Sequence, residues 1–451
     1  KQRHMKYPIG IQNFEDLRLN NYIYIDKTKY IYKLANEGKY YFLSRPRRFG
    51  KSLLISTIEA YFQGKRELFD GLAIQQEEKE WNSYPILHID LNTANFREED
   101  SLYTLLNDYL CQWESVYGTR ESETTLALRF KGIVARIAQK EGKGVVILID
   151  EYDKPILQTL QHPELQDKHR NMLKAFYSVL KTQDKYIKFA FITGVTKFGK
   201  VSVFSDLNNL TDISMDNRYV AICGLTEEEL ASNFKQGIEE LAKTYGDTIE
   251  ETIAKLRERY DGYHFEEHTI GIYNPFSVLN AMSRKQYKDY WFETGTPTFL
   301  VDLLKMHNYR LQDLTTERVS GDVINSIDSM STNPIPAIYQ SGYLTITGYD
   351  ERFKKYLLGF PNKEVEEGFI NFLLPLYSSA GTDSPFIVDE FVQDVETGKP
   401  EQFMQRMKAF FADTSYQVVG NAELYFQNVM YLVFKMMGFY TQVERPTSDG
   451  R

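Results

Sequence analysis

The sequence is that of an acidic chain of moderate length with few cysteines. It has 451 residues, of which 42% are hydrophobic and 25% charged, and its net charge at pH 7 is -9. This composition is typical of a globular protein, and the length indicates about two to four domains. The acidic balance argues against a general nucleic-acid-binding protein, although a local basic groove stays open. The two cysteines, Cys111 and Cys223, argue against a disulfide scaffold and against a cysteine-based zinc site.

The chain also lacks the patterns of a membrane or secreted protein. No uninterrupted apolar run is long enough to cross a bilayer, and no apolar signal core follows the first residues. Together with the few cysteines, these patterns predict a cytoplasmic protein without a membrane partner.

The first half of the chain alternates between strand-like and helix-like segments. An alternation of this kind predicts an α/β domain with a mostly parallel sheet. Strands are expected over 22–25, 40–43, 85–91, 145–149 and 188–194, and helices directly after residue 52, over 101–140 and over 164–183.

The pattern changes near Leu225. Thr226 and Glu229 have the spacing of a capping box, which predicts the start of a helix. Helices are expected to about residue 305, short strands and turns over 310–365, helices again over 387–440 with a break near residue 398, and a strand over 440–444.

A phosphate-binding loop is predicted between the strand at 40–43 and the helix that follows. The usual P-loop is Gly, four residues, then Gly-Lys-Ser/Thr. Here Gly50-Lys51-Ser52 matches the second half, Arg45 replaces the first glycine, and Pro46 removes one backbone donor. The strand before and the helix after the loop favour the prediction because a helix N-terminus attracts phosphate. The alternative is a basic surface turn that happens to contain Gly-Lys-Ser.

Roles follow from the chemistry of this loop. Lys51 is expected to reach the β- and γ-phosphates of ATP, and the Ser52 hydroxyl to bind Mg²⁺. The predicted nucleotide-binding residues are Arg45, Pro46, Arg47, Arg48, Phe49, Gly50, Lys51, Ser52, Leu53 and Thr193.

An acidic pair follows the strand at 145–149. Because ligands bind at the carboxyl ends of parallel strands, Asp150 is expected to hold Mg²⁺ and Glu151 to act as the general base. The alternative is an acidic turn after a core strand. Asp153 is as well explained as a helix cap or a surface charge.

A third strand end is expected at the same edge. Thr193, at the end of the strand over 188–194, is predicted to sense the γ-phosphate, and Lys197 is a weaker candidate. An ordinary glycine turn would explain this segment equally well.

Together these motifs resemble a bacterial family of AAA-ATPase-like proteins with a C-terminal PD-(D/E)XK nuclease-type domain. The resemblance covers nearly the whole chain, and the replacement of the first glycine of the loop is typical of the family. Its motifs are Ile9-Gly10-Ile11 with Phe14, Tyr24-Ile25-Asp26-Lys27-Thr28, residues 45–54, Asp150-Glu151-Tyr152-Asp153-Lys154-Pro155, residues 193–198, residues 208–214, Tyr260-Asp261-Gly262-Tyr263, residues 273–277 and residues 290–297.

The resemblance implies a P-loop NTPase core of the AAA/STAND type, a helical or winged-helix-like lid, and an incomplete C-terminal α/β module. Glu423 resembles the first acidic helix of the nuclease part, and residues 442–444 and 447–451 resemble the approach to its active site. The metal-binding motif itself is not in this sequence, so nuclease activity is not expected of this chain. The expected domains are residues 1–225 as the ATPase domain, 226–305 as the lid, 306–365 as a connection and 366–451 as the truncated nuclease-type module.

Three further features have structural explanations that are better than the functional ones. His264 and His268 have metal-ligand spacing only on a helix, and the turn-like sequence before them argues against one. The aromatic cluster at 290–292 is better explained by packing than by base stacking. The arginines Arg218, Arg257 and Arg259 are better explained by surface salt bridges than by phosphate contacts.

The sequence thus predicts an ATP- and Mg²⁺-binding protein, a slow ATPase or nucleotide-driven switch that controls an attached nuclease-type effector. One alternative is a nucleic-acid-binding module with a vestigial nucleotide site, which the altered loop favours. A weaker one is a protein-interaction scaffold with aromatic docking faces. A homo-oligomer and DNA or RNA contacts through the C-terminal module stay open.

Overall fold

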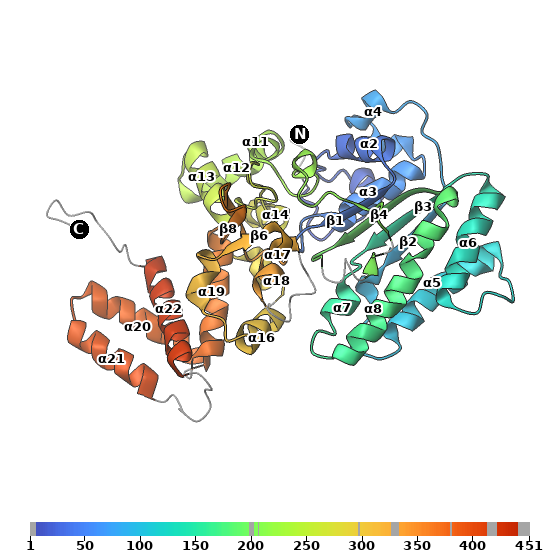
Figure 1. Ribbon diagram of the computed structural model, residues 1–451. Coiled ribbons are helices and arrows are strands. Elements are labelled where there is room, and N and C mark those ends of the chain that lie inside the picture. Colours follow the sequence, from blue (N-terminus) through green and yellow to red (C-terminus); the bar gives the residue numbers. More distant parts are fainter. Residues whose placement is uncertain are drawn as a thin grey trace.

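A computed structural model describes residues 6–197, 203–205, 207–295, 298–325, 333–378, 381–412 and 422–440. The chain is elongated, with a sheet at one end, a mixed body in the middle and the last helices at the other end (Figure 1). Among the described residues, no helix has the length and apolar character needed to span a membrane. The expected strand over 440–444 and the nuclease-like segments 442–444 and 447–451 lie outside the described residues, apart from Tyr440, which ends a helix.

The sheet at one end has five parallel strands, as the sequence predicts for an α/β core. Its strand order is β2-β3-β4-β1-β5. β3 is buried along its whole length, which agrees with its continuous apolar sequence. The strands are β1 (Tyr40–Ser44), β2 (Ile86–Asp90), β3 (Val145–Asp150), β4 (Ile187–Gly194) and β5 (Thr211–Asp212).

This strand order decides which residues meet at the carboxyl edge. β4 lies between β1 and β3, with Leu43 opposite Thr193. On the far side of β3, Asp150 lies opposite Asp90 at the end of β2. The loop after β1 and the acidic pair after β3 therefore lie on either side of Thr193.

Helices cover both faces of the sheet. In Figure 1, α2 and α3 lie on one side, and α5, α6 and α8 cross the other. The helices of this half are α1 (Phe14–Leu19), α2 (Thr28–Glu37), α3 (Lys51–Phe62), α4 (Ile74–Glu77), α5 (Ser101–Tyr117), α6 (Leu126–Glu141), α7 (Lys154–Leu157), α8 (Pro163–Tyr177) and α9 (Val179–Thr182), with 3-10 turns η1 (Arg66–Phe69), η2 (Leu91–Thr93), η3 (Asp184–Tyr186) and η4 (Asn217–Tyr219).

The second half begins with the expected helix. Thr226 and Glu229 form the capping box that the sequence predicts, at the start of α11. A small antiparallel sheet in the order β6-β8-β7 follows the helical region. The elements are α11 (Glu227–Asn233), α12 (Lys235–Tyr245), α13 (Ile249–Tyr260), α14 (Pro275–Arg284), α15 (Tyr290–Glu293), α16 (Thr298–Met306), η5 (Leu311–Thr315), β6 (Arg318–Ser320), α17 (Gly321–Asn325), α18 (Ile335–Gln340), β7 (Thr345–Asp350), β8 (Lys355–Gly359), α19 (Lys363–Tyr377), η7 (Gly381–Asp383), α20 (Ser384–Glu396), α21 (Pro400–Ala412) and α22 (Ala422–Tyr440).

Two hydrophobic cores organise these elements. The larger one is continuous from Phe14 and the parallel sheet to Met437 of α22. A smaller core consists of residues from Leu225 to Tyr290, against which Ile23 and Ile25 of the N-terminal segment pack. The helical region after residue 225 therefore has a core of its own, whereas the C-terminal helices share the core of the sheet.

Two local expectations differ from the structure. Residues 22–25 alternate like a strand but are not one, since only Tyr22 forms a bridge, to Lys6. The alternation instead lets Ile23 and Ile25 face the smaller core without a strand partner. Residues 101–140 form two helices, because the chain turns at Gly118, whose φ is +79°.

Candidate functional site

The loop between β1 and α3 presents a row of unpaired backbone donors. Gly50 lies before α3 with φ +93°, a conformation that suits glycine. Within the described part of the chain, the N–H groups of residues 47–53 have no hydrogen-bond acceptor, while the N–H of Leu54 already bonds to the Gly50 carbonyl. Unpaired N–H groups at a helix N-terminus form a natural anion site.

Lys51 lies inside this loop. Its side chain is almost fully buried, and Nζ donates to the carbonyls of Arg45 at 3.1 Å and Pro46 at 3.2 Å. The carboxylate of Glu151 is 3.7 Å from the same ammonium. Lys51 thus links the loop to the acidic pair. A phosphate bound in the loop would compete with these acceptors for the Lys51 ammonium.

Ser52, Asp150 and Thr193 form one hydrogen-bonded group across three elements. The Ser52 hydroxyl donates to Asp150 Oδ2 at 2.6 Å, and the Thr193 hydroxyl donates to Asp150 Oδ1 at 2.6 Å. The structure therefore brings together the two predicted metal-binding residues. It places Thr193 against the carboxylate, so its contact with a γ-phosphate stays a prediction.

Glu151 has an unusual backbone conformation. Its φ is +56°, which is rare for a residue with a side chain and is often found at functional sites. Burial raises the pKa of Glu151 to about 7, and the Lys51 ammonium opposes this shift. A buried carboxyl group whose pKa is raised beside a charged partner is a candidate acid or base.

Asp153 is neither a surface charge nor a side-chain cap. It is fully buried and accepts hydrogen bonds from the backbone N–H of Thr196 at 2.7 Å and from its hydroxyl at 2.8 Å. It therefore fixes the turn after β4 to the turn after β3. The sequence alternatives for Asp153 did not include this role.

Arg45, which replaces the first glycine of the motif, has a buried side chain. Its guanidinium donates to the carbonyls of Ser44 at 3.0 Å, Ser214 at 2.7 Å and Tyr219 at 3.3 Å. It also lies 3.9 Å above the Phe265 ring. Its Nε has no hydrogen-bond partner among the described residues, but the other contacts hold the guanidinium inside the protein, where it supports the loop.

The other two arginines of the loop lie differently. Arg47 stacks on Trp291 at 4.8 Å and donates to the Tyr343 hydroxyl at 3.2 Å. Arg48 is exposed with φ +65° and lies over Phe276 at 5.2 Å. Arg48 is therefore the loop arginine whose charge faces solvent, although its contact with a phosphate stays a prediction.

The remaining loop residues are held by the second half of the chain. Pro46 is buried against Gly342, where a Cβ would lie 2.7 Å from the proline. Phe49 is buried with its ring 4.8 Å from that of Tyr263. Thus each residue from 45 to 49 contacts residues beyond 224.

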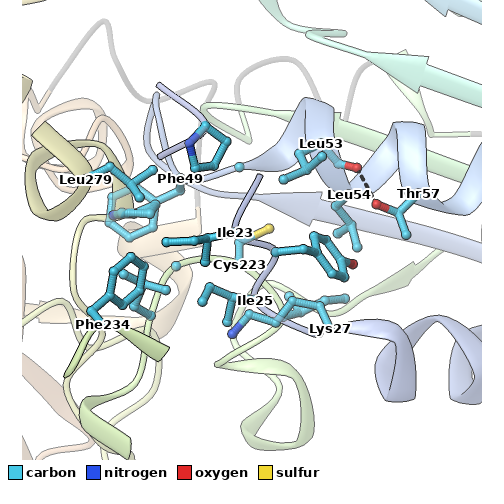
Figure 2. Close-up of a pocket in the computed structure, with 17 residues that line it drawn as sticks. Ile23, Ile25, Lys27, Phe49, Leu53, Leu54, Thr57, Cys223, Phe234 and Leu279 are labelled. Atoms are coloured by element: carbon cyan, nitrogen blue, oxygen red, sulfur yellow. Dashed lines mark hydrogen bonds between the residues drawn. The ribbon is translucent and has the colours of Figure 1, made fainter. Parts of the chain in front are cut away.

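An apolar cavity of about 100 Å³ lies beside Gly50, between the N-terminal segment, α3 and the helical region (Figure 2). Leu53 lines it, as do side chains of both hydrophobic cores. Its other lining residues are Pro8, Ile23, Tyr24, Ile25, Lys27, Phe49, Leu54, Thr57, Ile222, Cys223, Gly224, Leu225, Phe234, Pro275 and Leu279.

Lys27, which lines this cavity, forms an ion pair that the sequence did not reveal. Lys27 is buried, and its Nζ lies 2.7 Å from the carboxylate of Glu229. Burial lowers the pKa of Lys27, while Glu229 raises it. Glu229 also caps α11, so this pair ties the N-terminal segment to the helical region. Lys27 belongs to one of the motifs that carry the family resemblance, and this was the only sequence feature that could have drawn attention to it.

The weaker candidates have structural roles. His264 bonds to the Thr269 carbonyl rather than to a metal-binding partner. Among the described residues, no group of three or more His, Cys, Asp or Glu could hold a metal ion by itself. The three surface arginines form salt bridges: Arg218 with Asp216 and Glu37, Arg257 with Glu227, and Arg259 with Asp289 and Glu367.

Mg²⁺ nevertheless fits the donors at the edge of the sheet. The ion keeps several waters and takes only one or two protein oxygens when phosphates supply the rest. Ser52 and Asp150 provide a hydroxyl and a carboxylate oxygen 2.6 Å apart. These residues therefore suit a magnesium ion that arrives with a nucleotide.

The five-stranded parallel sheet, the loop with its unpaired donors and the acidic pair define a P-loop-like core. A family model described as "Predicted AAA-ATPase" matches residues 8–204. The chain is also similar to "Uncharacterized protein in vnfD 5'region" of Azotobacter chroococcum mcd 1, with 34% identity over 459 residues, 99% of this chain and 86% of the relative. Residues 8–204 therefore belong to the predicted AAA-ATPase-like family, which suggests nucleotide binding, and the whole chain belongs to one family with this uncharacterized relative. The family model ends before the C-terminal helices, so their nuclease-type assignment stays a prediction.

Proposed function

We propose that the chain binds ATP with Mg²⁺ and acts as a slow ATPase or nucleotide-driven switch for its C-terminal helices. The observation that carries this proposal is the row of unpaired N–H groups over residues 47–53, with the Lys51 ammonium inside the same loop. Backbone N–H groups and one lysine are the set of donors with which P-loop proteins bind phosphates.

The metal side of the site supports the same proposal. When bound, Mg²⁺ would supply positive charge that neutralises the charge developing during hydrolysis. Ser52 and Asp150 would hold it, and the Thr193 hydroxyl would keep the Asp150 carboxylate in place. Glu151 would orient the attacking water and accept its proton once the phosphates have engaged Lys51, its present ion-pair partner.

The apolar cavity is the best candidate for the nucleotide base. It adjoins Gly50, and its walls are apolar, which suits the faces of a purine ring. Its volume of about 100 Å³ is smaller than the cavity of about 150 Å³ that accepts benzene. A purine therefore has to widen it. Because the walls come from both hydrophobic cores, base binding would shift the helical region relative to the sheet.

The proposed switch follows from this arrangement. A ligand shifts a conformational equilibrium only if it binds one arrangement better than the other. Here the phosphates would contact the sheet side of the site, while the base would contact both sides. We extend this proposal to control of an attached nuclease-type effector, which the resemblance implies for the C-terminal module.

The alternative of a nucleic-acid-binding module gains no support from the loop. Arg45 is buried, and the side chain of Arg47 is stacked on Trp291. Only Arg48 of the three loop arginines is exposed. A single exposed arginine is a weak basis for a salt-dependent nucleic-acid contact.

The test is calorimetric titration of the full chain with ATP and Mg²⁺. Lys51→Ala should abolish detectable binding, whereas Lys181→Ala, at an exposed lysine of α9, should not change it. Glu151→Gln should keep binding and lose phosphate release. If wild-type protein does not bind ATP, the proposed binding is wrong. If Glu151→Gln hydrolyses ATP at the wild-type rate, the proposed catalytic role of Glu151 is wrong.

A further inference from the structure

The phosphate loop contains a residue with a strained backbone. Arg45 occupies the position of the first glycine without a positive φ, whereas Arg48 adopts φ +65°, which is unfavourable for a residue with a Cβ. A strained backbone persists only where surrounding contacts enforce it. Contacts from outside the loop therefore hold the backbone at Arg48 in place.

Trp291 makes the most direct of these contacts. Its indole is fully buried, and a buried indole N–H requires an acceptor. Nε1 donates to the backbone carbonyl of Arg47 at 3.0 Å. The Arg47 guanidinium, 4.8 Å above the same ring, also donates to Tyr343. Both the backbone and the side chain of Arg47 are thus fixed by Trp291 and Tyr343.

Trp291 is itself held from the other side. Its backbone N–H donates to Glu364 Oε1 at 2.7 Å, and Glu364 also accepts from the Ser277 hydroxyl at 2.9 Å. Glu364 lies at the start of α19, which packs against α22 and forms the Glu366–Lys435 ion pair with it. The loop is therefore connected through one tryptophan to the C-terminal helices.

We infer that Trp291 is a positioning residue for the phosphate-binding loop, which it holds at the strained residue Arg48. By bonding to the Arg47 carbonyl, it keeps the peptide between Arg47 and Arg48 in the conformation that leaves the N–H groups unpaired. This inference rests on the proposed function for its consequence in ATP binding, but its structural part stands on the loop alone.

Trp291→Phe provides the test, because it retains an aromatic ring and removes the N–H donor. Two properties of the full chain are measured: the Kd for ATP with Mg²⁺, and the rate of tryptic cleavage after Arg47 and Arg48, followed by mass spectrometry. We expect a Kd about ten-fold higher, equivalent to about 1.4 kcal/mol, and faster cleavage because the loop opens more often. Trp113→Phe, at a half-buried tryptophan of α5, is the control and should change neither.

A second variant covers the case in which Trp291→Phe does not fold. Tyr343→Phe removes only the hydroxyl that accepts from Arg47 and should also speed cleavage at the loop. A wild-type cleavage rate in folded Trp291→Phe, a wild-type rate in Tyr343→Phe where Trp291→Phe does not fold, or equal acceleration in Trp113→Phe would overturn the inference. If wild-type protein binds no ATP, the proposed function fails, whereas the cleavage rates still decide whether Trp291 positions the loop.

Discussion

Glu364 offers a sharp prediction about stability and pH. It is fully buried, and burial raises the pKa of its carboxyl from 4.5 to about 8, although the hydrogen bonds from the Trp291 N–H and the Ser277 hydroxyl oppose this shift. Above about pH 4.5 the unfolded chain releases this proton, while the folded chain keeps it until about pH 8. Its contribution to stability is therefore complete below pH 4.5 and is lost as pH rises through 8.

The magnitude follows from the size of the shift. One pH unit corresponds to about 1.4 kcal/mol, so the free energy of unfolding should fall by on the order of 3 kcal/mol between pH 6 and 9 through this group. That is a large part of the net stability of about 5–15 kcal/mol of an ordinary protein. Glu364→Gln should remove this loss, because the amide cannot ionise, can accept from the Trp291 N–H and can donate to Ser277.

The assay is urea unfolding of wild-type protein and Glu364→Gln at several pH values in this range. Glu250→Gln, at an exposed glutamate of α13, serves as the control. We expect the wild-type and control curves to lose stability together at high pH and the Glu364→Gln curve to remain flatter. The same pH slope in all three proteins would refute the burial argument for Glu364.

Four further variants have outcomes that simple measurements can check. Gly262→Ala should cost about 2 kcal/mol or more, since its φ is +91° and a Cβ would lie 2.0 Å from the Pro361 carbonyl. Gly246→Ala, with φ +71° and open space, should cost about 1 kcal/mol, so equal midpoints in urea would contradict the steric part. Arg257→Ala breaks a half-exposed ion pair and should change stability by less than about 1 kcal/mol by the same measurement. Asp150→Asn should make the affinity for ATP nearly independent of Mg²⁺; calorimetry with and without EDTA tests this, and an unchanged Mg²⁺ effect would argue against the metal assignment.

Local sequence patterns predicted the elements of the sheet well. The apolar run before Asp150 gave a buried strand, and the Thr226–Glu229 spacing gave a capping box. These features depend on neighbours in sequence, which a single chain displays. The alternation at Ile23 and Ile25 was misleading because it reports only that one side is buried, and not whether a strand partner exists.

The candidate site was predictable in part for the same reason. Ser52 lies in the first turn of α3, and Asp150 is the last residue of β3. Their contact therefore follows from the order of the parallel strands. The contacts of Lys27 with Glu229 and of Trp291 with Arg47 join residues more than 200 positions apart. No periodicity records such a contact, and only the packing of the second half on the loop creates it.

The dependence of the loop on distant residues limits how this protein can be divided. A fragment that ends at residue 204, like the family match, would omit β5 and the Ser214 and Tyr219 carbonyls that hold Arg45. One that ends at 225 would uncover the Phe49 ring by removing Tyr263. Such fragments should be insoluble when expressed alone. For the same reason, exchanging the C-terminal half between relatives should succeed only when residues 45–49 are exchanged with it.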